Sequence, residues 1–206
     1  MKANRLTWRT EMLGRYTFPY VYWDNFFDEE SIQAMEKYCN DAGTDEAMVI
    51  NERGEAMKTD ARKSRSRIHN IDGNNLWLFE RMRAMTEHAN TEYFNFDLLG
   101  FDYFQYTEYG NSGDHYDWHS DLIYGAQLPA YMNFPRKLSF IYVLSDSDEF
   151  TGGELQFKPD TDKPVTAEQK RGRLFAFPSW VLHRVTPIES GTRRSLVWWC
   201  SGPKFK

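Results

Sequence analysis

The sequence predicts a mainly β protein with supporting helices (α+β), built on a double-stranded β-helix (jelly roll) core with N-terminal helices packed on one sheet. From about residue 94 onward, short apolar runs recur at roughly ten-residue spacing between Gly, Pro, Asn and Asp, which is typical of an antiparallel sandwich or barrel. Before that point, two stretches space their apolar residues by three, as amphipathic helices do. The two periodicities divide the chain into a helical part and a β part.

The β part contains a series of apolar runs that predict strands. They are FDYFQYTEY from residue 101, RKLSFIYVLS from 136, GELQFK from 153, GRLFAFPS from 172, HRVTPI from 183 and RRSLVWWC from 193. We expect residues 94–206 to form the jelly-roll core of a single domain that spans residues 1–206.

The helical part is expected to support that core. Residues 28–42 (DEESIQAMEKYCNDA) open with acidic side chains and are followed by Gly43, which favours a helix that ends there. Residues 74–89 (NNLWLFERMRAMTEHA) predict a second helix. Between them, residues 51–67 are polar and charged, with no apolar face. We expect that stretch to be a mobile loop able to gate a site, within a helical support region at residues 1–93.

Composition narrows the class of protein. The chain has 206 residues, of which 41% are hydrophobic and 17% aromatic, and this favours one folded domain over disorder. A net charge of −5 argues against tight, unselective nucleic-acid binding. Cys39 and Cys200 match no zinc spacing and favour a reducing compartment. No apolar run approaches the roughly 20 residues that span a bilayer, so we expect a cytoplasmic protein with no membrane partner.

The stretch HYDWHSD, residues 115–121, holds the candidate metal ligands. On an extended segment His119 and Asp121 project to the same side, because side-chain direction alternates with period two. Of the remaining histidines, His183 is best placed to be the third ligand. Two imidazoles and one carboxylate on one face of an octahedron are typical of non-haem Fe(II) oxygenases, whereas zinc prefers a closed tetrahedron. His-x-Asp pairs are common by chance. The alternative to a metal site is therefore that His119 and Asp121 are ordinary polar residues of the surface or of a strand.

A second feature follows ten residues after His183, where GTRRS offers Arg193 and Ser195. The planar guanidinium of arginine can donate two parallel hydrogen bonds to a carboxylate and stays charged when buried, which suits a dicarboxylate co-substrate. The alternative is that Arg193 and Arg194 cap an edge strand or face solvent. His115 lies at a helical offset from His119, so we expect it beside the site or on the surface.

Three segments together resemble a known family. They are YGNSGDHYDWHSD, KLSFIYVLSDSDEFTGGELQF and GRLFAFPSWVLHRVTPIESGTRRSLVWW, and from about residue 101 they make the chain similar to 2-oxoglutarate and Fe(II)-dependent oxygenases of the prolyl 4-hydroxylase type. The roles that this resemblance implies are iron ligation by His119, Asp121 and His183, co-substrate binding by Arg193, Tyr109 and Ser195, and a substrate pocket at Tyr116 and Trp199. Two departures stand out. Many collagen-type members have lysine in place of Arg193, and some relatives have tyrosine near Val143.

The resemblance also implies a reaction. With Fe(II), 2-oxoglutarate and O2, and with ascorbate as a further candidate cofactor, such an enzyme hydroxylates a C–H bond and releases succinate and CO2. A prolyl residue of a peptide or protein is the first expectation for the substrate. The alternatives are a free amino acid or other small molecule, and a non-catalytic, metal-binding, cupin-like jelly roll. A nucleic-acid substrate is disfavoured, because the dealkylases of this superfamily carry a second arginine where this chain reads SLVWWC. The oligomeric state stays open.

Overall fold

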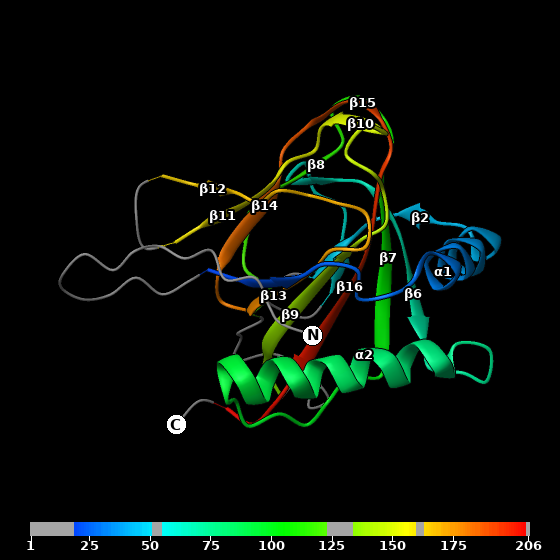
Figure 1. Ribbon diagram of the computed structural model, residues 1–206. Helices are drawn as coiled ribbons and strands as arrows, with labels where there is room; N and C mark the ends of the chain where they lie inside the picture. Colours follow the sequence, from blue (N-terminus) through cyan, green and yellow to red (C-terminus); the bar gives the residue numbers. More distant parts are fainter. Residues whose placement is uncertain (1–18, 51–54, 123–133, 160–162, 205–206) are drawn as a thin grey trace.

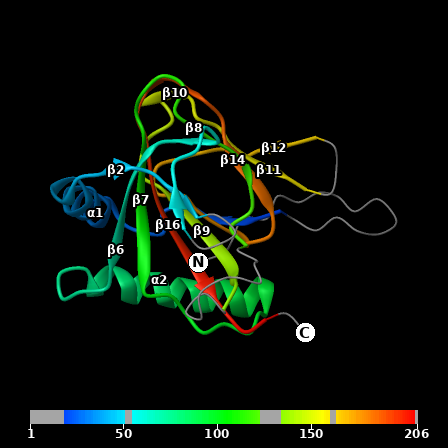
Figure 2. The same ribbon diagram turned by 180° about the vertical axis from the view of Figure 1, so that it is seen from behind.

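The computed structural model describes residues 19–50, 55–122, 134–159 and 163–204, which fold into two antiparallel sheets and two main helices (Figures 1 and 2). The larger sheet has the order β1 (Val21–Trp23), β13 (Leu174–Pro178), β9 (Arg136–Val143), β16 (Arg193–Ser201), β7 (Tyr103–Tyr109), β6 (Arg65–Asn70) and β2 (Asp45–Glu46). The smaller sheet has the order β12 (Val165–Thr166), β11 (Leu155–Lys158), β14 (Leu182–Val185), β8 (His115–His119) and β5 (Arg62–Lys63).

Two short strand pairs and the helices complete the fold. The pairs are β3 (Val49–Ile50) with β4 (Ala56–Met57), and β10 (Phe150–Gly152) with β15 (Ile188–Gly191). The helices are α1 (Glu29–Ala42) and α2 (Leu76–Ala89), the latter continued by the π-helical turn η1 (Asn90–Phe94). Each predicted apolar run contains a strand, and the helices lie on the side of the larger sheet that faces away from the smaller sheet (Figure 1). The predicted jelly roll with helices on one sheet is therefore confirmed.

Strand β9 shows how the larger sheet separates two cores. Leu138, Phe140 and Tyr142 belong to the cluster that the helices cover, whereas Ile141 and Val143 pack toward the smaller sheet. This division follows from the alternation of side chains along a strand. A sheet buried on both faces needs near-continuous apolar runs, which explains why these strands were readable in the sequence.

Helix α1 begins and ends as its sequence predicts. The side chain of Asp28 accepts a hydrogen bond from the Ser31 backbone N–H at 2.8 Å, which satisfies a donor that the first turn leaves free. Gly43 follows the last turn with a φ of +67°, a left-handed conformation that glycine adopts without steric cost. Both helices present their buried faces to the larger sheet, and Trp198 of β16 donates to the Thr86 hydroxyl of α2 at 3.1 Å.

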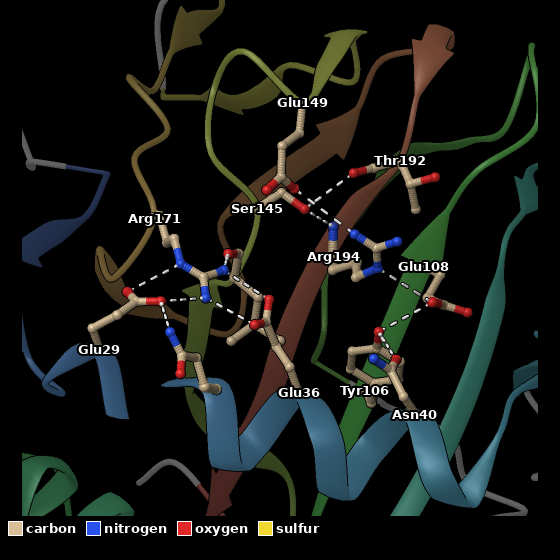
Figure 3. Close-up of polar contacts among 12 residues, drawn as sticks. Glu29, Glu36, Asn40, Tyr106, Glu108, Ser145, Glu149, Arg171, Thr192 and Arg194 are labelled. Carbon is tan, nitrogen blue, oxygen red and sulfur yellow. Dashed lines mark hydrogen bonds and ion pairs between the residues drawn. The ribbon is translucent and has the colours of Figure 1, made fainter. Parts of the chain in front are cut away.

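A network of ion pairs fixes α1 to the strands beside it (Figure 3). Arg171, in the turn before β13, pairs with Glu29 at 2.9 Å and with Glu36 at 2.7 Å, and also donates to the Leu144 carbonyl. Nearby, Arg194 of β16 lies 3.5 Å from Glu108. Bidentate pairs of this kind fix geometry more firmly than single surface contacts, so they set where the helix sits on the sheet.

Residues 51–67, which we expected to form a mobile loop, instead contribute to three strands. Residues 51–54 lie outside the described residues, but 56–57, 62–63 and 65–67 lie in strands β4, β5 and β6. Backbone pairing of β6 with β7 and of β5 with β8 does not require apolar alternation, because the ladder bonds come from the main chain. Arg67 also donates to the carbonyls of Ala42 and Gly43 at the end of α1. The charged residues of this stretch therefore take part in strand pairing and in hydrogen bonds that hold the end of α1.

Among the described residues, no helix has the length and apolar character needed to cross a bilayer. Strand β1 and the edge strands β2 and β5 also come from the part of the chain predicted to be a helical support region. The N-terminal half therefore contributes strands to both sheets as well as the two helices.

Replacing Gly191 with alanine is expected to lower the free energy of unfolding by at least about 2 kcal/mol, because left-handed strain and a steric overlap would add. Gly191 has a φ of +76°, and an added Cβ would overlap the Glu149 carbonyl oxygen in the β10–β15 pair. Gly43→Ala is the matched control, since its φ is +67° but nothing lies within 4 Å of its Cβ position. Urea unfolding measures both variants, and equal losses would contradict the steric argument.

Lowering the pH should destabilise the metal-free protein through His69. Its ring is buried between Phe104, at a centroid distance of 4.9 Å, and Tyr38, at 5.1 Å. Burial, and then the charge of Arg67, lower the pKa of His69 below its ordinary 6.5. The unfolded chain therefore binds the proton first, and stability falls as the pH drops below about 6.5.

Between pH 7.5 and 5.0 this single group can cost at most about 2 kcal/mol. Urea unfolding at the two pH values should show a smaller loss in His69→Phe than in the wild type. An identical loss in the two proteins would show that another group carries the dependence.

Candidate metal centre

The three predicted ligands meet at the junction of two paired strands. His119 ends β8, Asp121 lies two residues later, and His183 on β14 pairs directly with His119. The Nε2 atom of His119 is 3.9 Å from Asp121 Oδ1, and that of His183 is 3.5 Å from Asp121 Oδ2. One ligand atom from each of the three residues lies within 4.8 Å of the others. Antiparallel pairing thus brings together side chains that are remote in the sequence.

Backbone carbonyls orient both imidazoles. Nδ1 of His119 lies 2.8 Å from the Asp117 carbonyl oxygen, and Nδ1 of His183 lies 3.0 Å from that of Val181. Since a carbonyl oxygen can only accept, each Nδ1 carries the proton and each Nε2 presents a lone pair toward Asp121. Fixing the tautomer in this way is what metal-binding histidines require.

The electrostatics of the three groups also fit a cation. Burial, then the neighbouring His183, lower the pKa of His119 to about 3, so the ring is neutral at pH 7. Burial opposes ionisation of Asp121, but His183 and His119 hold the pKa of its carboxyl below the ordinary value. Its Oδ2 atom is buried and has no hydrogen-bond partner in the described part of the chain. Lone pairs that face each other at this range repel unless a positive charge lies between them, which is the requirement for a divalent metal.

A cavity of about 220 Å³ opens beside these ligands, between the two sheets. Alternate residues of β16 line it, namely Arg193, Ser195, Val197 and Trp199, because β16 turns its other face to the helices. The predicted site residues that line it are His119, Asp121, His183, Arg193, Ser195, Tyr109, Tyr116 and Trp199. The structure therefore brings every predicted site residue to one cavity.

Arg193 is held in this cavity by neutral groups. Its side chain is 1% exposed, its Nε donates to Gln169 Oε1 at 2.7 Å, and its Nη1 reaches the Ser195 hydroxyl at 3.4 Å. The Nη2 atom is buried without a partner among the described residues, and burial lowers the pKa of the group. A buried guanidinium without an anion is costly, so this arrangement suits an anionic ligand. The alternative that Arg193 faces solvent is wrong.

Aromatic rings form the remaining walls. The Tyr116 ring stacks on His119 with centroids 3.5 Å apart and planes 15° apart. Trp199 is 8% exposed, and its indole N–H has no partner within the described residues. By contrast, Val143 packs between the sheets and does not line the cavity. Tyr116 and Trp199 thus supply flat apolar surface beside the candidate ligands.

The other histidines lie elsewhere. Both ring nitrogens of His115 approach backbone carbonyls, those of Gly113 and Asp60, so this residue is not available as a ligand. His69 is in the core under α1, and His88 lies on α2. His115 lies at the opposite end of β8 from His119 and does not line the cavity.

Sequence reasoning missed three residues of the site. Arg62 was expected only as part of a mobile loop, yet it is 9% exposed and lines the cavity. Arg136 lines the cavity too, although nothing distinguished it within its strand. Gln169 sits in the irregular segment before β13 and carried no signal, but it holds Arg193 and donates to the Gly153 carbonyl at 3.0 Å. Only the pairing of strands in the folded protein shows that these three residues belong to the site.

Comparison with known families shows what the β core is similar to. The family description "2OG-Fe(II) oxygenase superfamily" matches residues 104–201, the range that holds the candidate ligands and Arg193. This part of the chain is similar to members of the 2OG-Fe(II) oxygenase superfamily. The resemblance in the sequence is confirmed.

Curated relatives are similar to part of the chain. A PKHD-type hydroxylase of Synechococcus sp. (strain CC9605) is 35% identical over 89 residues, which are 43% of this chain and 37% of the relative. A PKHD-type hydroxylase of Crocosphaera subtropica is 35% identical over 88 residues, 41% of this chain and 36% of the relative. The chain thus spans little more than a third of the length of these relatives.

Solved structures share the fold over nearly the whole chain. A Pseudomonas putida prolyl-4-hydroxylase superposes with a TM-score of 0.69 at 18% identity, covering 91% of this chain and 95% of that one. A prolyl hydroxylase from Trichoplax adhaerens, in complex with a hypoxia inducible factor peptide fragment, gives 0.70 at 17% identity over 89% and 83%. At this identity the likeness establishes the jelly-roll fold alone.

Removal of one ligand is expected to weaken metal binding sharply. Asp121→Ala and His183→Ala should each lower the affinity for Fe(II) by at least about a hundredfold, since even supporting residues of metal sites contribute 10- to 100-fold. Anaerobic equilibrium dialysis with Fe(II) measures the change. His115→Ala is the matched control and should bind as the wild type does, and a similar loss in all three variants would contradict the assignment.

Proposed function

We propose that the protein is an Fe(II)- and 2-oxoglutarate-dependent oxygenase that hydroxylates a C–H bond, with a prolyl residue of a peptide or protein as its substrate. The observation that supports this most is the guanidinium of Arg193, whose buried Nη2 atom has no partner among the described residues and which lies in the same cavity as His119, Asp121 and His183. A metal triad alone fits many sites, whereas a triad with a buried, unpaired cation fits a chelating ligand that carries a second carboxylate.

The residues divide into two sets of roles. His119, Asp121 and His183 would hold Fe(II), which, when bound, supplies activation of O2 coupled to oxidation of 2-oxoglutarate to succinate and CO2. Arg193 would donate to the far carboxylate of 2-oxoglutarate, with help from the Ser195 hydroxyl. Gln169 fixes the guanidinium plane, so that Nη2 keeps its direction before the ligand arrives.

The walls of the cavity suit the substrate side of the reaction. Tyr109 lies against Arg193, with the guanidinium carbon 5.5 Å from its ring centroid, and helps to exclude water from the carboxylate. Tyr116 and Trp199 offer rings against which a pyrrolidine can pack. We also propose ascorbate as a further cofactor, which would act as a reductant. The prolyl substrate is supported by the relatives and structural neighbours, which are PKHD-type and prolyl hydroxylases.

A free amino acid or other small molecule is a second candidate substrate, and the modest cavity of about 220 Å³ favours it. The non-catalytic, cupin-like alternative is weaker. A jelly roll that only binds metal has no use for a buried guanidinium such as that of Arg193, which has no anionic partner among the described residues and would cost stability without a ligand to offset it.

An anaerobic titration tests the proposal. Fe(II) and 2-oxoglutarate together should give the wild type a visible metal-to-ligand charge-transfer band. Arg193→Met should weaken 2-oxoglutarate binding by about a hundredfold, and Gln169→Leu by about tenfold, because a buried charged hydrogen bond and its support are lost. Fe(II) affinity should be unchanged in both variants.

Arg194→Met is the matched control, because Arg194 is the next residue of β16 but pairs with Glu108 and Glu149 outside the cavity. It should keep the wild-type response. Absence of the band in the wild type, or the same 2-oxoglutarate dependence in Arg193→Met, would refute the proposal. Succinate release above the substrate-free background, measured with proline peptides and with free amino acids, then separates the two substrate classes.

A further inference from the structure

Two further arginines reach the cavity from outside the proposed co-substrate site. Arg62 of β5 has its guanidinium carbon 4.7 Å from the centroid of the Tyr116 ring. Arg136, the first residue of β9, has its guanidinium carbon 3.8 Å from the centroid of Trp199. Both arginines line the cavity that holds the candidate metal ligands. Each therefore lies over one of the two rings proposed to contact the substrate.

Neutral hydroxyl groups accept hydrogen bonds from the guanidinium groups of Arg62 and Arg136, and each guanidinium has further N–H groups that can bind a ligand. Arg62 donates through Nε to the Ser64 hydroxyl at 3.0 Å, and Arg136 donates through Nη2 to the Tyr103 hydroxyl at 2.9 Å. Within the described ranges, neither forms an ion pair with a carboxylate. Arg173, which is buried elsewhere in the fold, pairs with Asp24 at 2.6 Å. The arginines of the cavity thus lack the partners that a buried arginine elsewhere in this fold has.

The charge balance of the cavity indicates why Arg62 and Arg136 lack carboxylate partners among the described residues. Among the lining residues that the structure describes, Asp121 supplies the one carboxylate. With Fe(II) and the 2-oxoglutarate dianion bound, the charges of the metal, Asp121, the co-substrate and Arg193 cancel. Arg62 and Arg136 then remain as two uncompensated cations at low-dielectric walls, where they attract an anion more strongly than exposed arginines do.

We propose that Arg62 and Arg136 bind a carboxylate of the substrate, so that the substrate class is an acid whose carboxylate lies near the attacked C–H bond. This inference rests on the proposed function and narrows it. The carboxylate has two sources, a free amino acid or other small acid, and an acidic side chain of a peptide. In both cases the stacked rings hold the guanidinium planes in place, so little entropy is lost when the anion binds.

The test compares acids with their amides in the anaerobic protein loaded with Fe(II) and 2-oxoglutarate, where no turnover occurs. The small-molecule pair is L-proline and L-prolinamide. The peptide pair is acetyl-Ala-Pro-Asp-amide and acetyl-Ala-Pro-Asn-amide. Calorimetric titration measures binding, and quenching of tryptophan fluorescence gives a second readout because Trp199 lies under Arg136. In at least one pair, the acid should bind about tenfold or more tightly than the amide.

Substitutions then assign the preference. Arg62→Gln and Arg136→Gln should each bring the acid-to-amide ratio close to one. Arg62→Lys and Arg136→Lys, which keep the charge but lose the planar fork, should retain part of it. Arg184→Gln is the matched control, because Arg184 also stacks on an aromatic ring, 4.7 Å from the Trp118 centroid, but does not line the cavity. It should keep the full ratio.

A preference in the proline pair would identify a small acid, and one in the peptide pair an acidic peptide. If neither pair shows a preference in the wild type, or if the preference survives both glutamine substitutions, the inference is overturned. The charge-transfer band, recorded in the same samples, separates the two levels. A band without any acid preference overturns this inference alone, whereas a missing band overturns the proposed function with it.

Discussion

The pairing of β14 with β8 is the constraint on which the site depends. It sets His183 directly opposite His119 and leaves Asp121, just past the end of β8, within ion-pair range of both rings. Because side chains alternate with period two, a slip of one residue in this register would turn the imidazole of His183 to the other face of the sheet. The chemistry of the site therefore depends on main-chain hydrogen bonds between strands that are far apart in the sequence.

The larger sheet gives the site its second wall and its stability. Strand β16 buries Leu196 and Trp198 under the helices and turns Arg193 and Trp199 into the cavity. Placing a cation in a dry interior costs free energy, and the apolar face of the same strand offsets that cost by anchoring the strand against α2. The helices thus act on the site indirectly, through the strand that carries its arginine.

The arginines of this fold separate into two groups by their partners. On the outer side, Arg171 and Arg194 bind carboxylates that tie α1 and the β9–β10 turn to the sheet. In the cavity, Arg62, Arg136 and Arg193 are held by hydroxyl, amide and aromatic groups, none of which neutralises a charge. Identical side chains serve structure in one place and are available for ligands in the other, and only the neighbours distinguish them.

The sequence by itself determined the strands after residue 94, both helices, the His119-x-Asp121 pair and the importance of Arg193, because local periodicity and motif spacing act over a few residues. Tertiary structure alone decided that residues 62–67 form strands and that Arg136 and Gln169 belong to the site. Edge strands held by backbone ladders need no apolar pattern, and the partner of a polar side chain depends on which strands lie beside it. That choice of neighbours is made by long-range packing, which no local pattern encodes.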